Sequence, residues 1–148
     1  MTVTIRTATP ADRERSLELL AVLNASFTEH PAETLAPLFD DLTSGARGTI
    51  LLAEEDDTLL GIATVSFNLA LRYGGEYCQL EELVVHPDAR GKNVGGRLVE
   101  ATIETARARG CAEYGLYLVA HTEHNRGFYE KYGFEMVGSE MRMPLERN

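Results

Sequence analysis

The chain has 148 residues, 44% of them hydrophobic and 25% charged, which is typical of one soluble globular domain over residues 1–148. The net charge of −9 disfavours nucleic acid as a partner, because binding to a phosphate backbone requires a cationic surface. The apolar runs are too short to span a membrane, and the first residues lack a signal peptide's apolar core, so we expect a cytoplasmic protein that binds no membrane. The two cysteines, Cys78 and Cys111, lack metal-site spacing, and we expect no metal.

The first half of the chain shows alternating strand patterns and two helical ones. Thr9 and Pro10 predict a helix start, with Asp12 placed as a capping residue and Glu14 on a solvated face. We expect, in order, a strand over 3–7, a helix with inner residues Leu17, Leu20, Ala21 and Asn24, a helix from Pro31 with inner residues Leu35, Leu38, Phe39 and Leu42, and strands over 49–54, 58–70 and 77–85, joined by turns at 55–57 and 73–75.

The second half contains the best helical pattern of the sequence, over 95–109, which Gly110 ends. Its inner face is predicted to comprise Leu98, Val99, Thr102, Ile103 and Ala106. A short strand over 114–119, a helix over 123–132 and one or two closing strands within 135–145 follow. The predicted order is therefore βααβββαβαβ.

Residues 83–98 join a β-branched apolar run to this helix through a Pro-Asp turn and a loop rich in glycine and cations. A strand, a glycine loop and a helix start leave several backbone N–H groups unpaired and pointing one way. Such a nest attracts an anion, and Arg90, Lys92 and Arg97 add positive charge beside it. We therefore expect the stretch to bind the diphosphate of a cofactor.

Two common phosphate-binding motifs do not fit this loop. A P-loop ends in Gly-Lys-Ser/Thr, whereas Gly96 is followed by Arg97 and Leu98. The spacing of Gly91, Gly95 and Gly96 also differs from the dinucleotide fingerprint. The loop instead resembles the Arg/Gln-x-x-Gly-x-Gly/Ala loop of the GNAT superfamily of acyl-CoA-dependent N-acyltransferases. Asn93 replaces the middle glycine, and asparagine tolerates positive φ better than most residues.

A second stretch, His124-Asn125-Arg126-Gly127-Phe128-Tyr129-Glu130-Lys131-Tyr132-Gly133-Phe134, is similar to the other GNAT signature. The asparagine that often opens this signature falls at Thr122. The resemblance implies an α/β (α+β) fold with a mixed, mostly antiparallel sheet of six to seven strands flanked by about four helices. It also implies an N-acetyltransferase that takes its acetyl group from acetyl-CoA.

The resemblance further implies roles for individual residues. Leu83 and Val85 would offer backbone groups to the thioester and the pantetheine arm, and Tyr129 would protonate the departing thiolate; Tyr129 and Phe128 are alternatively core aromatics. The residues expected at the acetyl-CoA site are Leu83, Val84, Val85, Arg90, Gly91, Lys92, Asn93, Val94, Gly95, Gly96, Arg97, Asn125, Phe128 and Tyr129.

The general base is the least defined role. The position where several GNAT branches carry an acid is Gln79, which cannot accept the proton. Glu81 lies two residues on and hence on the same face of a regular strand, and Glu82 faces the other way unless a bulge intervenes. We expect Glu81 to be the base, with Glu82 as the second candidate and a water chain as a further alternative.

The acceptor is expected to be a primary amine of a small molecule or peptide. The spacing from Gly61 to Val85, with Asn93, resembles aminoalkylphosphonate N-acetyltransferases within the superfamily. Two alternatives remain: a non-catalytic acyl-CoA-binding module, and a loop that binds another phosphate ligand. The resemblance also implies a possible homodimer, and His121 and His124 are interpreted as exposed loop residues.

Overall fold

A computed structural model describes residues 2–23, 27 and 29–147. The chain divides into two compact units, Met1–Tyr117 and Leu118–Asn148, and each is described by itself. None of the described helices is long and apolar enough to cross a membrane.

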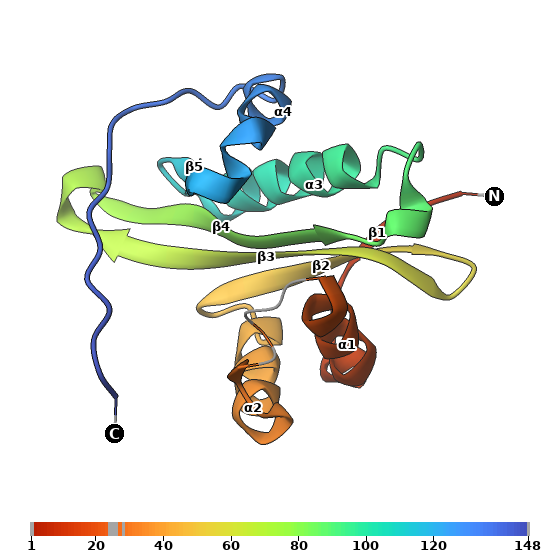
Figure 1. Ribbon diagram of the computed structural model, residues 1–148. Helices are drawn as coiled ribbons and strands as arrows, with labels where there is room; N and C mark the ends of the chain where they lie inside the picture. The colour runs from red at the N-terminus through yellow and green to blue at the C-terminus, as the bar shows by residue number, and fades with distance from the viewer. Residues whose placement is uncertain (1, 24–26, 28, 148) are drawn as a thin grey trace. The chain divides into compact units, whose positions relative to one another are not determined.

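The first unit is built on a five-stranded sheet with the strand order β1-β2-β3-β4-β5 (Figure 1). All neighbouring strands pair antiparallel except β4 and β5, which are parallel. The elements in chain order are β1 (Thr4–Thr7), α1 (Arg13–Leu23), α2 (Ala32–Thr43), β2 (Gly48–Glu55), β3 (Thr58–Ala70), β4 (Gly75–Val85), α3 (Val94–Arg109) and β5 (Tyr114–Leu116).

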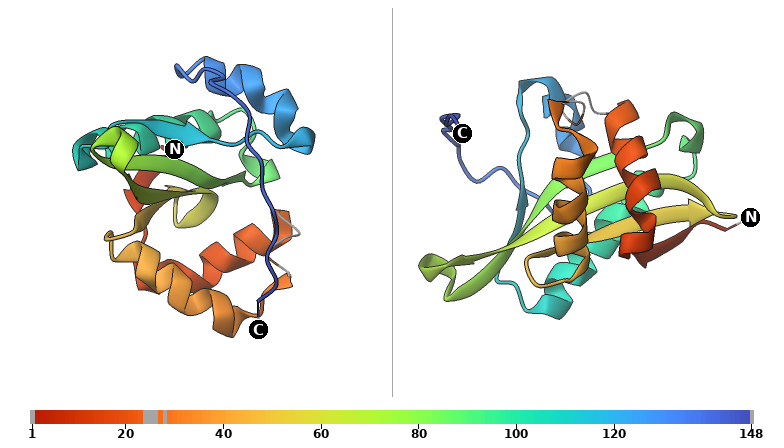
Figure 2. Two further views of the ribbon diagram at one scale, coloured as in Figure 1. Left: turned by 90° about the vertical axis from the view of Figure 1, so that its left-hand side faces the viewer. Right: turned by 90° about the horizontal axis from the view of Figure 1, so that it is seen from below.

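Helices cover both faces of this sheet (Figure 1; Figure 2, right). On one face, α1 and α2 bury Leu19, Leu20 and Phe39 against strand residues that include Ile62 and Val84; we call this the α1/α2 face. On the other face, α3 buries four of the five inner residues expected from its periodicity, namely Leu98, Val99, Thr102 and Ala106, while Ile103 is half-buried. The buried core of the first unit therefore has two layers, one on each side of the sheet.

Gly61 on β3 allows α3 to lie close to the sheet. A Cβ atom at this position would lie 2.8 Å from Val94 Cγ1 and 3.0 Å from Leu98 Cδ1. A larger residue would require the Val94 and Leu98 side chains at the start of α3 to shift. The position of the α3 N-terminus thus depends on the absence of a side chain in the strand beneath it.

The second unit contains a 3-10 helix over Ala120–Asn125 and the short helix α4 over Arg126–Glu130. The prediction of a helix over 123–132 was therefore right in place and wrong in extent. No strand forms in 134–147, so the predicted closing strands over 135–145 are wrong, and the sheet has five strands rather than six or seven. Val137, Met141 and Met143 are largely exposed, because a β-compatible sequence forms a strand only where a partner strand pairs with it.

Most other elements lie where the sequence predicts them. Strand β3 has the predicted bounds, and Gly110 ends α3 with φ of 84°. Asp56 and Asp57 form the first hairpin turn with positive φ. Strand β5 ends at Leu116 rather than 119. Leu38, predicted to face inward, is 56% exposed, and Asn24 lies outside the described residues.

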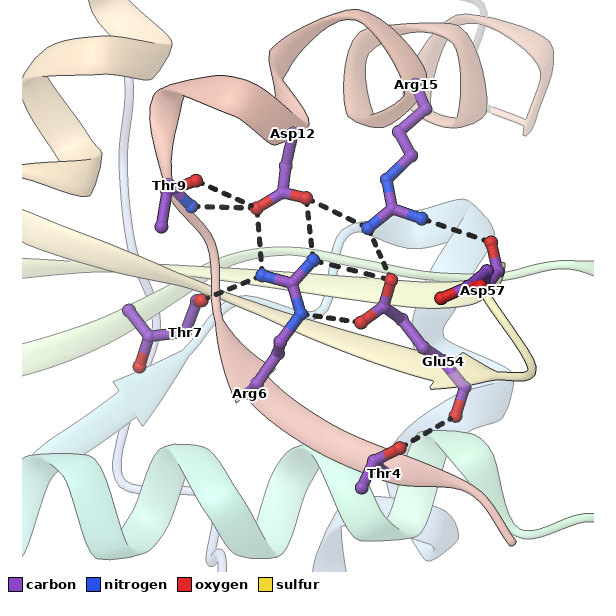
Figure 3. Close-up of polar contacts among 8 residues, drawn as sticks. All are labelled: Thr4, Arg6, Thr7, Thr9, Asp12, Arg15, Glu54 and Asp57. Atoms are coloured by element: carbon purple, nitrogen blue, oxygen red, sulfur yellow. Dashed lines mark hydrogen bonds and ion pairs between the residues drawn. The ribbon is translucent and has the colours of Figure 1, made fainter.

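Four charged side chains link β1, the start of α1 and β2 (Figure 3). Arg6 donates to Asp12 at 2.6 Å and to Glu54 at 2.5 Å, and Arg15 donates to Asp12 at 2.9 Å and also to Glu54. Asp12 accepts the Thr9 N–H at 2.8 Å as well, which completes the predicted capping box. The sequence predicts only the capping role of Asp12, because nothing local in it shows that Glu54 comes within reach.

Asp12 is buried, and its guanidinium partners compensate the desolvation of its charge. The Arg6 guanidinium, more than the other groups, holds the pKa of Asp12 well below its ordinary range, and the pKa of Glu54 is lowered by the same residue. Carboxylates with a depressed folded-state pKa contribute stability above their unfolded pKa and lose it as the pH falls toward the folded value. Stability should therefore decrease progressively below about pH 4.

Replacing Asp12 tests this network. We expect Asp12→Asn to lower the free energy of unfolding by about 1.5–3 kcal/mol at pH 7, because hydrogen bonds to charged groups are lost inside a buried site. The variant should also lose less stability than the wild type between about pH 4 and pH 2. Urea denaturation across this pH range measures both effects.

The control is Glu104→Gln, which breaks the exposed Arg107–Glu104 pair on α3. Its effect should stay within about 0.5 kcal/mol, because exposed ion pairs contribute little. Equal losses in the two variants would contradict a special role for Asp12.

Candidate active site

A β-bulge interrupts the pairing of β3 and β4. Thr64 pairs with Glu82 and Val65 pairs with Leu80, so that Glu81 is the extra residue of β4. A bulge bends its strand and changes the direction of its side chains. The alternation of β4 side chains between the two faces of the sheet is therefore interrupted at Glu81 and resumes at Glu82.

Both candidate bases point to the same face of the sheet. Ser66 Oγ donates to Glu81 Oε2 at 2.6 Å, and Thr64 Oγ1 donates to Glu82 Oε1. Thr64 and Ser66 are two residues apart on β3 and follow Ile62 in its alternation, which places them on the α1/α2 face. Since the bulge intervenes, Glu82 does not face away from Glu81 as it would in a regular strand.

The two carboxylates differ in their surroundings. Glu81 is exposed, whereas Glu82 is half-buried. Burial raises the pKa of Glu82, the Thr64 hydrogen bond lowers it, and the nearby charge of Glu81 raises it; the net shift is upward. A carboxylate with a raised pKa is a stronger proton acceptor once it is ionised.

On the opposite edge of β4, no strand of the described first unit pairs beyond the bulge. Strand β5 pairs only with Cys78, Gln79 and Leu80. His86 N–H donates to Leu60 O at 2.8 Å, and hydrogen-bonded pairs alternate with non-bonded ones along an antiparallel ladder. The backbone N–H and C=O groups of Leu83 and Val85 therefore point toward the β5 side, where β5 no longer reaches, while Val84 packs in the core on the α1/α2 face. An extended ligand can pair with this edge as an added strand.

The loop before α3 forms a tight turn with two left-handed residues, Gly91 with φ of 84° and Asn93 with φ of 55°. The structure confirms the interpretation that Asn93 replaces a glycine at positive φ. Asn93 precedes the helix without capping it through its side chain, and Arg97 N–H donates to Asn93 O at 3.0 Å. The N–H groups of the first turn, on Val94, Gly95 and Gly96, are thus not capped by the Asn93 side chain.

The three cations of this loop are placed differently. Lys92 Nζ forms an ion pair with Glu55 Oε1 at 2.9 Å, and the Arg97 guanidinium donates to the carbonyl of Val3. Arg90 is exposed. Of the three, Arg90 is the one whose side chain forms no ion pair or hydrogen bond with the described part of the chain.

In the second unit, Tyr129 lies among aromatic rings. Its ring centroid is 5.1 Å from that of Phe128 and 5.9 Å from that of Phe134, both in edge-to-face contact. Burial raises the pKa of the Tyr129 hydroxyl. Asn125 directly precedes α4 and is partly buried, as Phe128 is. Within the described ranges, 2–23, 27 and 29–147, no three metal-ligating side chains gather.

A family model described as the acetyltransferase (GNAT) family matches residues 16–134. The chain belongs to this family. It is 31% identical over 137 residues to glucosamine 6-phosphate N-acetyltransferase 1 of Oryza sativa subsp. japonica, covering 84% of this chain and 81% of that one. It is 29% identical over 145 residues to the probable glucosamine 6-phosphate N-acetyltransferase 2 of the same plant, covering 94% and 86%.

Among solved structures, a protein titled transcriptional regulator from Bacillus halodurans C-125 superposes with a TM-score of 0.86 at 26% identity, over 97% of this chain and 100% of that chain. The GNAT fold is thereby established over nearly the whole length. Family membership makes the protein an N-acetyltransferase and implies acetyl-CoA as its acyl donor.

The narrower resemblance to aminoalkylphosphonate N-acetyltransferases is not supported, since the two named relatives are glucosamine 6-phosphate enzymes. That resemblance depended on the Asn93 loop and the strand before it. The sequence resemblance assigns these residues to the donor side, so they carry little information about the acceptor.

The conformation of Asn93 generates a prediction about donor binding. Asn93→Val should weaken binding of CoA about 10-fold or more, because a β-branched residue is strained at φ of 55° and would shift the first turn of α3. Asn93→Gly should retain the affinity, since glycine adopts this conformation freely. Isothermal titration with CoA measures both, and equal affinities for the two variants would contradict the assignment.

Proposed function

We propose that this GNAT protein, acting as one domain over residues 1–148, transfers the acetyl group of acetyl-CoA to a primary amine by direct attack on the thioester. The observation that carries the proposal is the arrangement of β4 around its bulge. A half-buried carboxylate on Glu82 lies next to the unpaired edge formed by Leu83 and Val85. A base and the groups that would hold the donor therefore come from consecutive residues of one strand.

The donor would be held by the main chain at two places. The N–H groups of Val94, Gly95 and Gly96 would bind the diphosphate at the positive end of the α3 dipole, with Arg90 adding charge beside it. The pantetheine arm would pair with the edge of Leu83 and Val85, and a backbone N–H there would polarise the thioester carbonyl. The uncapped helix start and the open strand edge support this placement.

Glu82 would remove the proton from the acceptor ammonium group, directly or through a water molecule. Its raised pKa supports this role, because it brings the proton affinity of the carboxylate closer to neutral pH. Glu81 remains the second candidate, as an exposed carboxylate on the same face.

Tyr129 would donate the proton that the departing thiolate needs. A tyrosine hydroxyl, with an ordinary pKa of about 10, keeps its proton at neutral pH, and burial raises the pKa of Tyr129 further. Phe128 would pack beside Tyr129 through their edge-to-face contact. Gly91 and the paired side chains Lys92 and Arg97 would shape the donor site rather than carry its charge.

An acceptor panel tests the function. Thiol release from acetyl-CoA should depend on the added amine, and glucosamine 6-phosphate belongs in the panel because the named relatives carry it in their names. Diamines, amino sugars without phosphate and peptide N-termini complete it. Tight CoA binding without amine-dependent thiol release from any acceptor would contradict the proposal and favour an acyl-CoA-binding module.

The base is tested by its pH profile. Glu82→Gln should lower kcat/KM about 100-fold or more and remove the acidic limb of the pH–rate profile, because the amide cannot accept the proton. In the wild type, this limb should lie above pH 4.3, the ordinary pKa of glutamate, since the pKa of Glu82 is raised.

Glu81→Gln provides the comparison, since it removes the neighbouring charge on the same face. It should shift the acidic limb slightly to lower pH without removing it, because the Glu81 charge raises the pKa of Glu82. Loss of the limb in Glu81→Gln, with the limb retained in Glu82→Gln, would make Glu81 the base.

A further inference from the structure

The hydroxyl of Thr64 makes two hydrogen bonds to the same residue across the sheet. It accepts the backbone N–H of Glu82 at 3.1 Å and donates to Oε1 of the Glu82 side chain. Thr64 is only 3% exposed, and it pairs with Glu82 in the β3–β4 ladder. One buried hydroxyl thus connects the main chain and the carboxylate of the candidate base.

The direction of these bonds follows from the groups involved. An amide N–H can only donate, so the hydroxyl must accept from it and keeps its single proton for the carboxylate. Oε1 is therefore turned back toward β3. Oε2 accepts no hydrogen bond from the side chains or main chain of the described residues. It is therefore the carboxylate oxygen that is available to accept a proton from a substrate.

We propose that Thr64 is a positioning residue for acetyl transfer, whose hydroxyl holds Glu82 in one rotamer with Oε2 directed to the acceptor amine. The proposal rests on the assignment of Glu82 as the base. Threonine suits this task because its branched side chain is restricted at χ1 and is locked further by the surrounding core. A hydroxyl on a flexible side chain would fix the carboxylate less well.

The hydrogen bond from Thr64 also opposes the effect of burial on the pKa of Glu82. A hydrogen bond donated to a carboxylate favours its charged form, so Thr64 lowers the pKa that burial raises. The charged group that acts on Glu82 is Glu81, beside it on β4. Ser66 on β3 is uncharged, and the cations Arg13 and Arg15 of α1 are engaged in ion pairs with Asp40 and Asp12.

The sheet contains a matched control for this contact. Ser66, two residues after Thr64, donates to Glu81 in the same way as Thr64 donates to Glu82. The carboxylate of Glu81, however, is exposed. Ser66→Ala therefore removes the same kind of hydrogen bond from the neighbouring glutamate. The pair of variants separates an effect on the base from a general effect of losing a β3 hydroxyl.

The test compares Thr64→Val, Thr64→Ser and Ser66→Ala with the wild type in pH–rate profiles. Thr64→Val keeps the shape of the side chain and removes the hydroxyl. We expect it to move the acidic limb upward by about 0.5–1 pH unit, the equivalent of one lost hydrogen bond. We also expect kcat to fall about 10-fold, with the KM for acetyl-CoA unchanged.

Thr64→Ser should restore the position of the acidic limb and most of kcat, and Ser66→Ala should leave the limb in place. A titration of the Glu82 carboxyl carbon by NMR provides the same pKa shift without requiring activity, and thermal melts confirm that each variant is folded. An unmoved limb and an unmoved Glu82 titration in Thr64→Val would overturn the proposal.

The pH–rate profile of Glu82→Gln separates two outcomes: that Thr64 does not position Glu82, and that Glu82 is not the base. If Glu82→Gln removes the acidic limb while Thr64→Val leaves it unmoved, Glu82 is the base and Thr64 does not position it. If Glu82→Gln retains the limb, or Ser66→Ala moves it, the assignment of the base is wrong and the role of Thr64 falls with it.

Discussion

The extra residue at Glu81 determines which face of the sheet the two glutamate side chains of β4 reach. Without it, Glu81 and Glu82 would point to opposite faces of the sheet. With it, both carboxylates reach the α1/α2 face, where Ser66 and Thr64 donate to them. Pairing with β5 ends at Leu80, the residue before the bulge, and a bulge bends its strand. One inserted residue thus accompanies both a half-buried carboxylate on one face and an open main-chain edge on the other side.

The first turn of α3 is placed by a separate constraint. Gly61 lets the helix lie against β3, and Asn93 adopts the positive φ from which the helix starts. Both residues act through small size or backbone conformation, and neither contributes a charge. The N–H groups of the turn are consequently presented by the fold itself. With such a turn, a protein with a net charge of −9 could hold the diphosphate of the proposed donor through backbone amides alone.

The elements that local sequence determines were predictable. Hydrophobic periodicity placed α3 and β3, and the tolerance of asparagine for positive φ predicted the Asn93 turn. Interactions between distant residues were not: the bulge depends on how β3 and β4 pair, and the Asp12 network joins residues more than 40 positions apart. The closing strands failed for the same reason, because the 135–145 pattern is suited to a strand but has no partner in the described residues. Long-range pairing is not encoded in a local pattern.

Most of the cationic side chains near the proposed donor site in the first unit are already engaged by other groups of the protein. Residues 90–97 suggest a cluster of positive charge, yet Lys92 is paired with Glu55 and Arg97 donates to the Val3 carbonyl. Elsewhere in the unit, Arg13 and Arg109 are likewise held by Asp40 and Glu76. The fold thus uses most of these cations to connect its own elements. The diphosphate would then depend mainly on backbone amides, whose direction is set by the helix and does not vary with side-chain rotamers. In such a site, the conformation of the turn matters more than the number of cations around it.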